Sequence, residues 1–310
     1  MDKIVLGTRG SPLALKQAND VRAKLESLGG IEVELVVIKT TGDLRTSERF
    51  KEIGTKGLFT KELDEALLAK KIDFAVHSMK DLPSEVPPGL TLACVPQAVD
   101  RRDAWVCPTG HTLASLPAGS KVGTSSLRRR ALVRLYRPDL VVEECRGNVE
   151  TRLSKVQSAA FDAILLACAG LTRLGLAEHI TQRLDPTRFF PAAGQGMIAI
   201  VCREDDPGTL GRLDRIRDAA SGARALAERY FLSGMDGGCS VPLGCHLEEV
   251  AAGYRMIGFL GRVHAESGEL VEHMIVETHA PNASEASRNL VQAMKDRGAE
   301  AWIREMKGER

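Results

Sequence analysis

One of the seven cysteines of this 310-residue chain stands in a sequence typical of a tight turn. Cys239 follows two glycines, and the segment 240–244 that comes after it reads SVPLG. Glycine permits backbone conformations that bring a neighbouring side chain close to a ligand, so a thiol in this position can be reactive. Two interpretations are open from this segment alone: a turn that carries a small hydrophobic side chain, and a covalent anchor for a ligand.

Arginines and hydroxyl residues gather at four turns, each between a predicted strand and a predicted helix. The turns are 8–11 (TRGS), 123–130 (GTSSLRRR), 145–152 (CRGNVETR) and 169–173 (AGLTR). Ligands of open α/β sheets bind at the carboxyl ends of strands, where helix N-termini favour anions. A single such arginine is typical of a solvated helix face. Repeated at several strand ends, they predict a ligand with several carboxylates or phosphates, which arginine binds in bidentate pairs.

A lone carboxylate follows a further predicted strand. Asp81 ends the segment 76–81 (VHSMKD), and we expect it to project into a cleft whose other charged groups are cations. An aspartate in such a cleft can stabilise a positively charged intermediate or orient N–H donors. The alternative is an aspartate that caps the turn before Pro83.

Charge and motif spacing argue against several other functions. The 42 basic and 41 acidic residues leave a net charge of +1, which predicts no general attraction to nucleic acids or anionic membranes. The cysteines form no C-x-x-C pair and the histidines are scattered, so we expect neither a disulfide framework nor a metal site. Phosphate-binding and dinucleotide-binding glycine motifs are absent. Without a secretory signal or an apolar run of about 18 residues, we predict a cytoplasmic protein with no membrane partner.

The basic turns belong to two stretches in which strands and helices alternate. In the first stretch, a strand over 3–8 leads into a helix with Ser11 as its cap and Pro12 at its first position. This alternation predicts right-handed, mostly parallel α/β sheets. The other expected strands are 31–39, 74–77, 90–95, 104–106, 121–123, 140–143 and 163–167, and the other helices are 58–70 and 126–136.

The last part of the chain has a different pattern. The segment 194–202 is strand-like and could return to the first sheet. Later strands at 254–263 and 270–277 and an amphipathic helix at 285–295 predict a separate, smaller α+β domain with an antiparallel sheet.

Taken in order, these segments resemble those of the porphobilinogen deaminases, also called hydroxymethylbilane synthases. The resemblance extends over nearly the whole chain. Its specificity lies in many separate segments that follow the family's order, since a glycine-flanked cysteine alone would indicate nothing. The segments are 8–15, 56–63, 76–81, 122–129, 146–149, 191–196 and 237–239.

The resemblance implies a fold of class α/β, with two domains similar to type II periplasmic binding proteins and a smaller C-terminal α+β domain with an antiparallel sheet. Domain 1 would be discontinuous, over 1–97 and 197–215, and domain 2 would cover 102–191. Domain 3, over 219–310, would carry Cys239.

The resemblance also implies a transferase of tetrapyrrole, porphyrin and heme biosynthesis. Such an enzyme condenses four porphobilinogen molecules head to tail, with loss of ammonia, on a dipyrromethane cofactor. A thioether to Cys239 would hold this cofactor, and water would finally release linear hydroxymethylbilane. A monomer with no nucleic-acid partner is expected.

The family's functional residues match many positions of this sequence, among them Asp81 and Lys80 as catalytic residues. Because every pyrrole carries an acetate and a propionate, a growing chain needs many fixed cations. Matches to cofactor contacts are Cys239, Arg9, Ser11, Lys56, Ser78, Lys80, Asp81, Thr124, Ser126, Arg128, Arg129, Arg146 and Gly147. Matches to substrate contacts are Arg9, Gln17, Arg146, Arg152, Arg173 and Gln195.

One departure from the family and two other functions stay open. Family members often have a second lysine four residues before Lys56, where this chain has Glu52 beside Lys51. A contact from the polar loop 41–55 is therefore open, and a lid over the cleft is the hypothesis for this loop. The other functions are a non-catalytic two-lobed binding protein for an anionic solute and a nucleotide- or phosphosugar-using enzyme. The glycine-flanked cysteine disfavours the first, and the missing phosphate loops disfavour the second.

Overall fold

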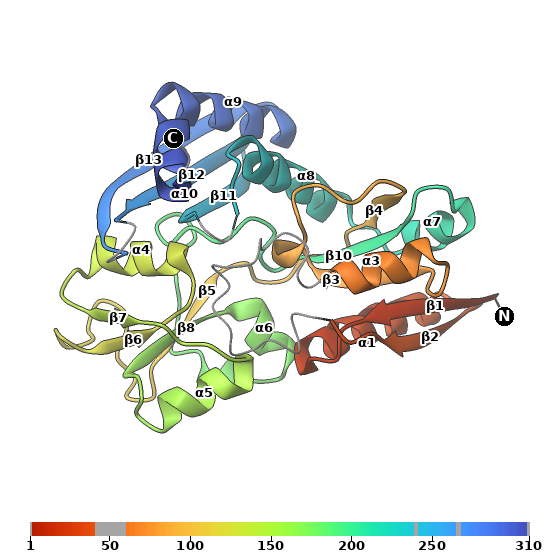
Figure 1. Cartoon of the computed structure of the whole chain (residues 1–310), viewed down its shortest axis with the longest axis horizontal. Coiled ribbons are helices and arrows are strands. Elements are labelled where there is room, and N and C mark those ends of the chain that lie inside the picture. The colour runs from red at the N-terminus through yellow and green to blue at the C-terminus, as the bar shows by residue number, and fades with distance from the viewer. Residues whose placement is uncertain (1, 41–59, 239–240, 265–267, 309–310) are drawn as a thin grey trace. The chain divides into compact units, whose positions relative to one another are not determined.

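The computed structural model describes residues 2–40, 60–238, 241–264 and 268–308 (Figure 1). The chain divides into two compact units. The first unit comprises residues 1–99 and 196–225, and the second comprises 100–195 and 226–310. The three domain boundaries expected from the sequence stay a prediction. None of the described helices is long and apolar enough to span a membrane.

A five-stranded sheet forms the centre of the first unit, in the order β2-β1-β3-β10-β4. β1 (Asp2–Thr8) is parallel to β2 (Ile31–Val37) and β3 (Phe74–Ser78). β10 (Ile198–Arg203) is antiparallel to both β3 and β4 (Leu90–Cys94). The return of the chain to the first sheet is therefore confirmed. The expectation of a mostly parallel sheet is confirmed, because four of the five described strands run in one direction and the returning strand β10 runs against them.

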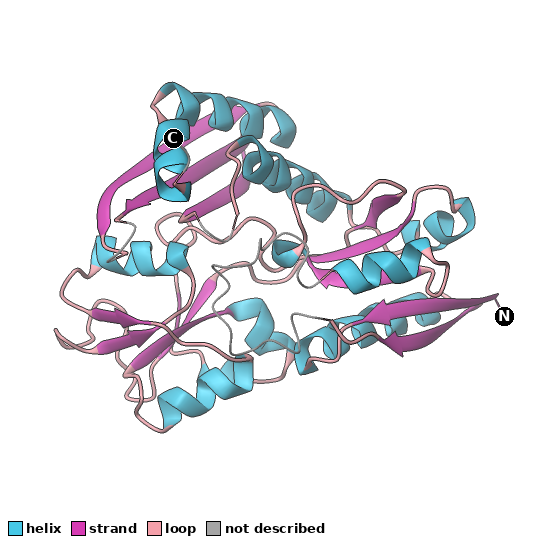
Figure 2. Ribbon diagram, in the orientation of Figure 1, coloured by secondary structure: helices cyan, strands magenta, loops and turns pink. Residues whose placement is uncertain are grey.

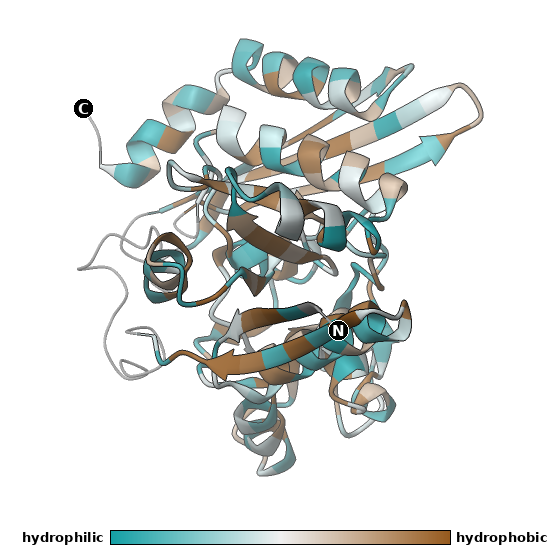
Figure 3. Cartoon of the chain, turned by 90° about the vertical axis from the view of Figure 1, so that its right-hand side faces the viewer, coloured by the Kyte–Doolittle hydropathy of each residue, from teal (hydrophilic) through white to brown (hydrophobic). Residues whose placement is uncertain are grey.

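Local sequence signals place the helices of this unit. α1 (Pro12–Ser27) begins after Ser11, whose Oγ accepts a hydrogen bond from the amide of Ala14 at 3.3 Å. The buried face of α1 belongs to the same hydrophobic core as the sheet. Further helices of this unit are α3 (Lys61–Leu68) and α7 (Pro207–Asp214). Figure 3 shows helices banded teal and brown, as expected when a helix buries one face.

The second unit repeats this pattern in a sheet of order β7-β6-β8-β5-β9. β6 (Lys121–Gly123) is parallel to β7 (Val141–Glu143) and β8 (Ala163–Ala167). β5 (Asp103–Val106) is antiparallel to β8 and β9 (Gln182–Arg183), so this sheet too is mixed. The helices that follow β6, β7 and β8 along the chain are α4 (Leu127–Tyr136), α5 (Val149–Gln157) and α6 (Cys168–Arg173). Figure 2 draws helices in cyan and strands in magenta.

A smaller antiparallel sheet of order β11-β12-β13 completes the second unit. Its strands are β11 (Leu243–Val250), β12 (Gly253–Val263) and β13 (Leu270–Ala280). The helices near it are α8 (Ala219–Gly234), α9 (Ala283–Asp296) and α10 (Ala299–Lys307). The expected β12, β13 and α9 are confirmed, whereas β11 and α10 were not expected from the sequence. The predicted fold class, α/β with a smaller antiparallel α+β part, is confirmed.

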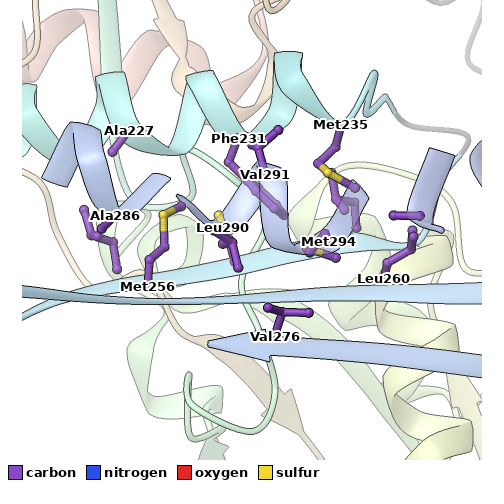
Figure 4. Packing of buried hydrophobic residues seen from close by; sticks show 14 of the residues in the cluster. Ala227, Phe231, Met235, Met256, Leu260, Val276, Ala286, Leu290, Val291 and Met294 are labelled. Atoms are coloured by element: carbon purple, nitrogen blue, oxygen red, sulfur yellow. The ribbon is translucent and has the colours of Figure 1, made fainter. Parts of the chain in front are cut away.

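The small antiparallel sheet packs against helices α8 and α9 in one buried cluster and against α4 in another. Phe231 and Leu290, from α8 and α9, share one buried cluster with Met256 of β12 (Figure 4). On the other side, β12 shares a buried cluster with α4. There the ring of Phe259 stacks on Phe190 with centroids 5.7 Å apart, an arrangement worth about 1 kcal/mol beyond its burial. The arginine-rich helix α4 is therefore fixed against the C-terminal sheet.

Candidate active site

The first unit contains a pocket at the carboxyl ends of β1 and β3, which we call the Asp81 pocket. These strands are parallel neighbours, so the turns after them meet at one edge of the sheet. Arg9 directly follows β1, and Asp81 ends the 3₁₀ turn η1 (Met79–Asp81) after β3. Lys80, in the same turn, is exposed. The lining residues are Arg9, Ser11, Leu13, Ala14, Gln17, Thr60, Val76, His77, Ser78 and Asp81.

Hydrogen bonds fix the neutral polar side chains of the Asp81 pocket. Gln17 is 3% exposed, and its Nε2 donates to the Ser78 hydroxyl at 2.9 Å. The Ser11 hydroxyl caps α1. These three positions were predicted as site residues, and the structure brings them together with Arg9 and Asp81. Among the described residues that line this pocket, the charged side chains are the guanidinium of Arg9 and the exposed carboxylate of Asp81.

His77 lines the same pocket but was not selected from the sequence, where the histidines show no pattern. Its side chain is buried, and its Nε2 has no hydrogen-bond partner among the described residues. Burial lowers the pKa of His77 to about 4, and the charge of Arg9 acts in the same direction. The imidazole is therefore neutral at neutral pH. Its position at the end of the same predicted strand, four residues before Asp81, was the sequence signal that could have placed His77 at the site.

In the second unit, hydroxyl groups organise the beginning of α4. The Ser126 side chain caps the helix and accepts a hydrogen bond from the Arg129 amide at 3.4 Å. Buried Thr124 accepts one from the Ser126 amide at 3.2 Å. An uncovered helix N-terminus favours anions, so this turn adds to the positive field of its arginines.

Arg128 and Arg129 converge on one buried carboxylate that the sequence reasoning missed. Asp103 accepts hydrogen bonds from both guanidiniums, each with a shortest distance of 2.7 Å, and from Gln195 Nε2 at 2.8 Å. We call these four residues the Asp103 cluster. Burial alone would raise the pKa of Asp103, but the two guanidinium charges hold it below its usual range. In the sequence, Asp103 belongs to the charged run 100–103, which is typical of an exposed segment.

Arg152 of α5 adds a third guanidinium near this cluster. Its Nε is buried and has no hydrogen-bond partner in the described part of the chain. Burial lowers the pKa of Arg152, and the positive charge of Arg129 lowers it further. Two neighbouring guanidiniums, one with a partnerless buried nitrogen, fit an anionic ligand because a carboxylate satisfies both the hydrogen bond and the charge.

The remaining predicted positions of this unit lie at the ends of α5 and α6. Arg146 is half-buried, and its Nε donates to Glu144 at 2.7 Å. Gly147 has a φ of +120°, and a Cβ there would lie 2.6 Å from a Thr151 methyl, so only glycine fits. Arg173 is half-buried in the last turn of α6.

Several predicted positions lie outside the described residues. They are Cys239, Lys56 and the loop 41–55 with Lys51 and Glu52. All cysteines that the structure describes are buried. No described cysteine therefore competes with Cys239 as an accessible anchor.

The chain on both sides of Cys239 is described and belongs to the second unit. The Val241 amide donates to the Gly238 carbonyl at 3.2 Å. A Cβ at Gly244 would lie 2.8 Å from the Phe190 carbonyl oxygen and 2.9 Å from Arg128 Cδ. The strand that follows the cysteine turn therefore packs closely against the arginine-bearing end of α4.

The chain matches family models and known proteins over most of its length. The family model described as "Porphobilinogen deaminase, dipyromethane cofactor binding domain" matches residues 4–210, and "Porphobilinogen deaminase, C-terminal domain" matches 223–296. The porphobilinogen deaminase of Syntrophomonas wolfei is 44% identical over 304 residues, 98% of each chain. That of Halalkalibacterium halodurans is 43% identical over 309 residues, 99% of this chain and 98% of the relative.

Two solved structures are more distantly similar. The alkanesulfonate-binding protein SsuA from Xanthomonas axonopodis is 13% identical, with a TM-score of 0.36 over 76% of this chain and 75% of that chain. The periplasmic VFT2 domain of BvgS from Bordetella pertussis is 14% identical, with a TM-score of 0.39 over 74% of this chain and 91% of that chain.

Proposed function

The chain belongs to the porphobilinogen deaminase family, and from this membership we propose which of its residues hold the cofactor and carry the reaction. The protein is a transferase that condenses four porphobilinogen molecules head to tail, with loss of ammonia, on a dipyrromethane cofactor and then releases hydroxymethylbilane by hydrolysis. We propose that the thiol of Cys239 holds the cofactor through a thioether.

The arginines of the second unit suit the cofactor and the growing product. Dipyrromethane, when bound, supplies the pyrrole carbon on which condensation starts. We assign acetate and propionate groups of the cofactor to Arg129 and those of the substrate to Arg152, supported by the buried Nε of Arg152, which has no partner among the described residues. Further proposed contacts to cofactor or substrate are Arg9, Ser11, Gln17, Lys56, Ser78, Lys80, Thr124, Ser126, Arg128, Arg146, Gly147, Arg173 and Gln195.

The Asp81 pocket suits the chemical step. Loss of ammonia from porphobilinogen leaves positive charge on the substrate, and a carboxylate stabilises that charge. The observation that carries this assignment is the exposed carboxylate of Asp81 in one pocket with Arg9. Arg9 binds a substrate carboxylate, while Asp81 accepts hydrogen bonds from pyrrole N–H groups. The neutral imidazole of His77 brings no positive charge that would oppose the developing cation.

Replacement of Asp81 tests the proposed function. We expect Asp81→Ala to fold and to lower kcat at least about 100-fold, as is typical when a preorganised electrostatic group is removed. The measurement is porphobilinogen consumption with a thermal melt of each protein. Glu85→Ala removes an exposed carboxylate four residues further on and is the matched control, with wild-type kinetics expected. Wild-type turnover by Asp81→Ala would remove Asp81 from the mechanism.

We also propose that the enzyme acts as a monomer in the cytoplasm, without a nucleic-acid or membrane partner. The net charge of +1 supports the absence of a nucleic-acid or membrane partner, because it gives the whole molecule no attraction to polyanions. Light scattering during size-exclusion chromatography measures the mass directly, and a dimer would contradict the proposal.

A further inference from the structure

Asp103 occupies a position that structural stability alone does not explain. It is the first residue of β5, its side chain is fully buried, and two guanidiniums surround it. One carboxylate cannot neutralise two guanidiniums. Buried ion pairs also tend to stabilise a protein less than apolar packing does, because the charges lose their hydration. The arrangement therefore indicates a role in function.

Asp103 fixes the orientation of Arg129. Nε and Nη2 of Arg129 donate to Oδ1 of Asp103 at 3.0 and 2.7 Å, and Nη1 donates to the carbonyl oxygen of Leu165 at 3.0 Å. A guanidinium is planar and has five N–H groups, so these bonds fix its plane. The direction of the N–H groups that remain for a ligand is thereby set. Arg152, whose pKa is lowered by burial and by Arg129, adds a second cation there.

The same carboxylate is linked to the strand that follows Cys239. Arg128 Nη1 donates to Oδ2 of Asp103 at 2.7 Å and also to the carbonyl oxygen of Phe190. The next residue, Pro191, accepts a hydrogen bond from the amide of Cys245 in β11 at 2.9 Å. Because Gly244 packs against Arg128 and Phe190, the position of β11 depends on Arg128 and through it on Asp103.

We propose that Asp103 is a positioning residue for the reaction. It directs Arg129 toward the carboxylates of the pyrrole chain, and through Arg128 it holds the strand that follows the cofactor cysteine. Asp103 itself contacts neither substrate nor cofactor. The inference rests on the proposed roles of Arg129 and Cys239.

Asp103→Asn in the full-length, cofactor-loaded protein tests the proposal. The substitution keeps the shape but turns an N–H group toward guanidinium N–H groups, so Arg129 and Arg128 lose their anchor. We expect the fraction of purified protein that carries two pyrrole units, measured by intact mass, to fall by about half or more. In the loaded fraction we expect KM for porphobilinogen to rise about tenfold, with a smaller change in kcat.

A partly buried ion pair in another sheet provides the control. Arg203 in the first unit is also buried, and its Nη2 lies 2.7 Å from Asp206 Oδ2. We expect Asp206→Asn to lower the melting temperature but to keep wild-type KM and cofactor content. Wild-type KM and cofactor content in Asp103→Asn would overturn the proposal. A fall in KM for porphobilinogen would also overturn it. In that case the negative charge of Asp103 would only weaken the attraction between the arginines and the substrate carboxylates, and Asp103 would not position Arg129.

A milder variant covers the case in which Asp103→Asn does not fold. Gln195→Met keeps both arginines but removes the donor to the Asp103 carboxylate, the acceptor for Arg129 Nη2 and a hydrogen bond to the Arg101 carbonyl oxygen. We expect KM to rise about two- to fivefold, since Asp103 and Arg129 keep their direct hydrogen bonds to each other. An unchanged KM in this variant would contradict the proposal.

Arg129→Leu separates this inference from the site assignment on which it rests. Wild-type KM and cofactor content in Arg129→Leu would mean that the carboxylate-binding role of Arg129 is wrong. An impaired Arg129→Leu together with an unimpaired Asp103→Asn would refute only the positioning role of Asp103.

Discussion

The Asp81 pocket and the Asp103 cluster are built in different ways. In the pocket, neutral side chains bond to one another, and the carboxylate of Asp81 is exposed. In the cluster, charged groups are buried and oriented by a carboxylate that itself has no exposure. The difference indicates that the two regions have different roles: the Asp81 pocket acts in the chemical step, and the Asp103 cluster positions arginines that bind carboxylates. A group that acts on each incoming substrate stays accessible, whereas cations that hold carboxylates through many additions gain from a fixed geometry.

Among substitutions at or near the Asp103 cluster, we expect Arg152→Leu to have the largest effect on KM. A charge-assisted hydrogen bond contributes about 1.5–3 kcal/mol, so we expect KM for porphobilinogen to rise about 10- to 100-fold. Initial rates measure this, and a thermal melt should show a folded protein. Arg288→Leu, an exposed arginine of α9, should leave KM unchanged. If Arg152→Leu also kept wild-type KM, the cluster would not be the carboxylate-binding side.

Alanine in place of glycine tests how tightly each region is packed. At Gly244 the new Cβ would meet Phe190 and Arg128 at 2.8 and 2.9 Å, so we expect a loss of about 1–3 kcal/mol in the free energy of unfolding. At Gly10, beside the Asp81 pocket, the nearest atom would be a Val37 methyl at 3.4 Å, an ordinary contact. We expect Gly10→Ala to change stability by less than about 0.5 kcal/mol. Equal losses in denaturant unfolding would refute the contrast.

The pH dependence from His77 is the smallest effect at neutral pH. Because burial lowers its pKa to about 4 in the folded state, the unfolded chain binds this proton first as the pH falls. Wild type should therefore lose stability relative to His77→Gln between about pH 6.5 and pH 4, with a slope below about 1.4 kcal/mol per pH unit.

Comparing wild type with His77→Gln also cancels the contribution of Asp64 to the pH dependence of stability, which has the opposite sign. Burial raises the pKa of Asp64 to about 6, so stability from Asp64 is lost as the pH rises from about 4 to 6. This term is the same in both proteins and cancels in their difference. Parallel stability curves of the two proteins against pH would contradict a buried, neutral His77.

Local signals predicted most elements of the fold, and tertiary effects account for the misses. The caps Ser11 and Ser126 located the beginnings of α1 and α4. The direction of β10 was not predictable, because alternation of apolar residues carries no information on strand direction. β11 (LGCHLEEV) has few β-branched residues, and its pairing with β12 stabilises it, which no local signal reports.

Site residues that directly follow strands could be predicted from the sequence. A site residue whose role depends on burial could not. Arg9 and Asp81 follow strands β1 and β3, so the rule for ligand sites in open sheets found them. Asp103 stands in a run with two arginines and an aspartate, which is typical of a solvated segment. Only the pairing of β5 with β8 and β9 makes it the buried centre of a cluster.

Intact-mass spectrometry of the denatured protein tests the central claim most directly, that Cys239 covalently holds a pyrrole cofactor. We predict that wild type and Cys107→Ser, which alters a buried cysteine, exceed their sequence masses by two pyrrole units. Cys239→Ser should have the mass of its sequence alone. Wild type without added mass, or Cys239→Ser that retains it, would contradict the account.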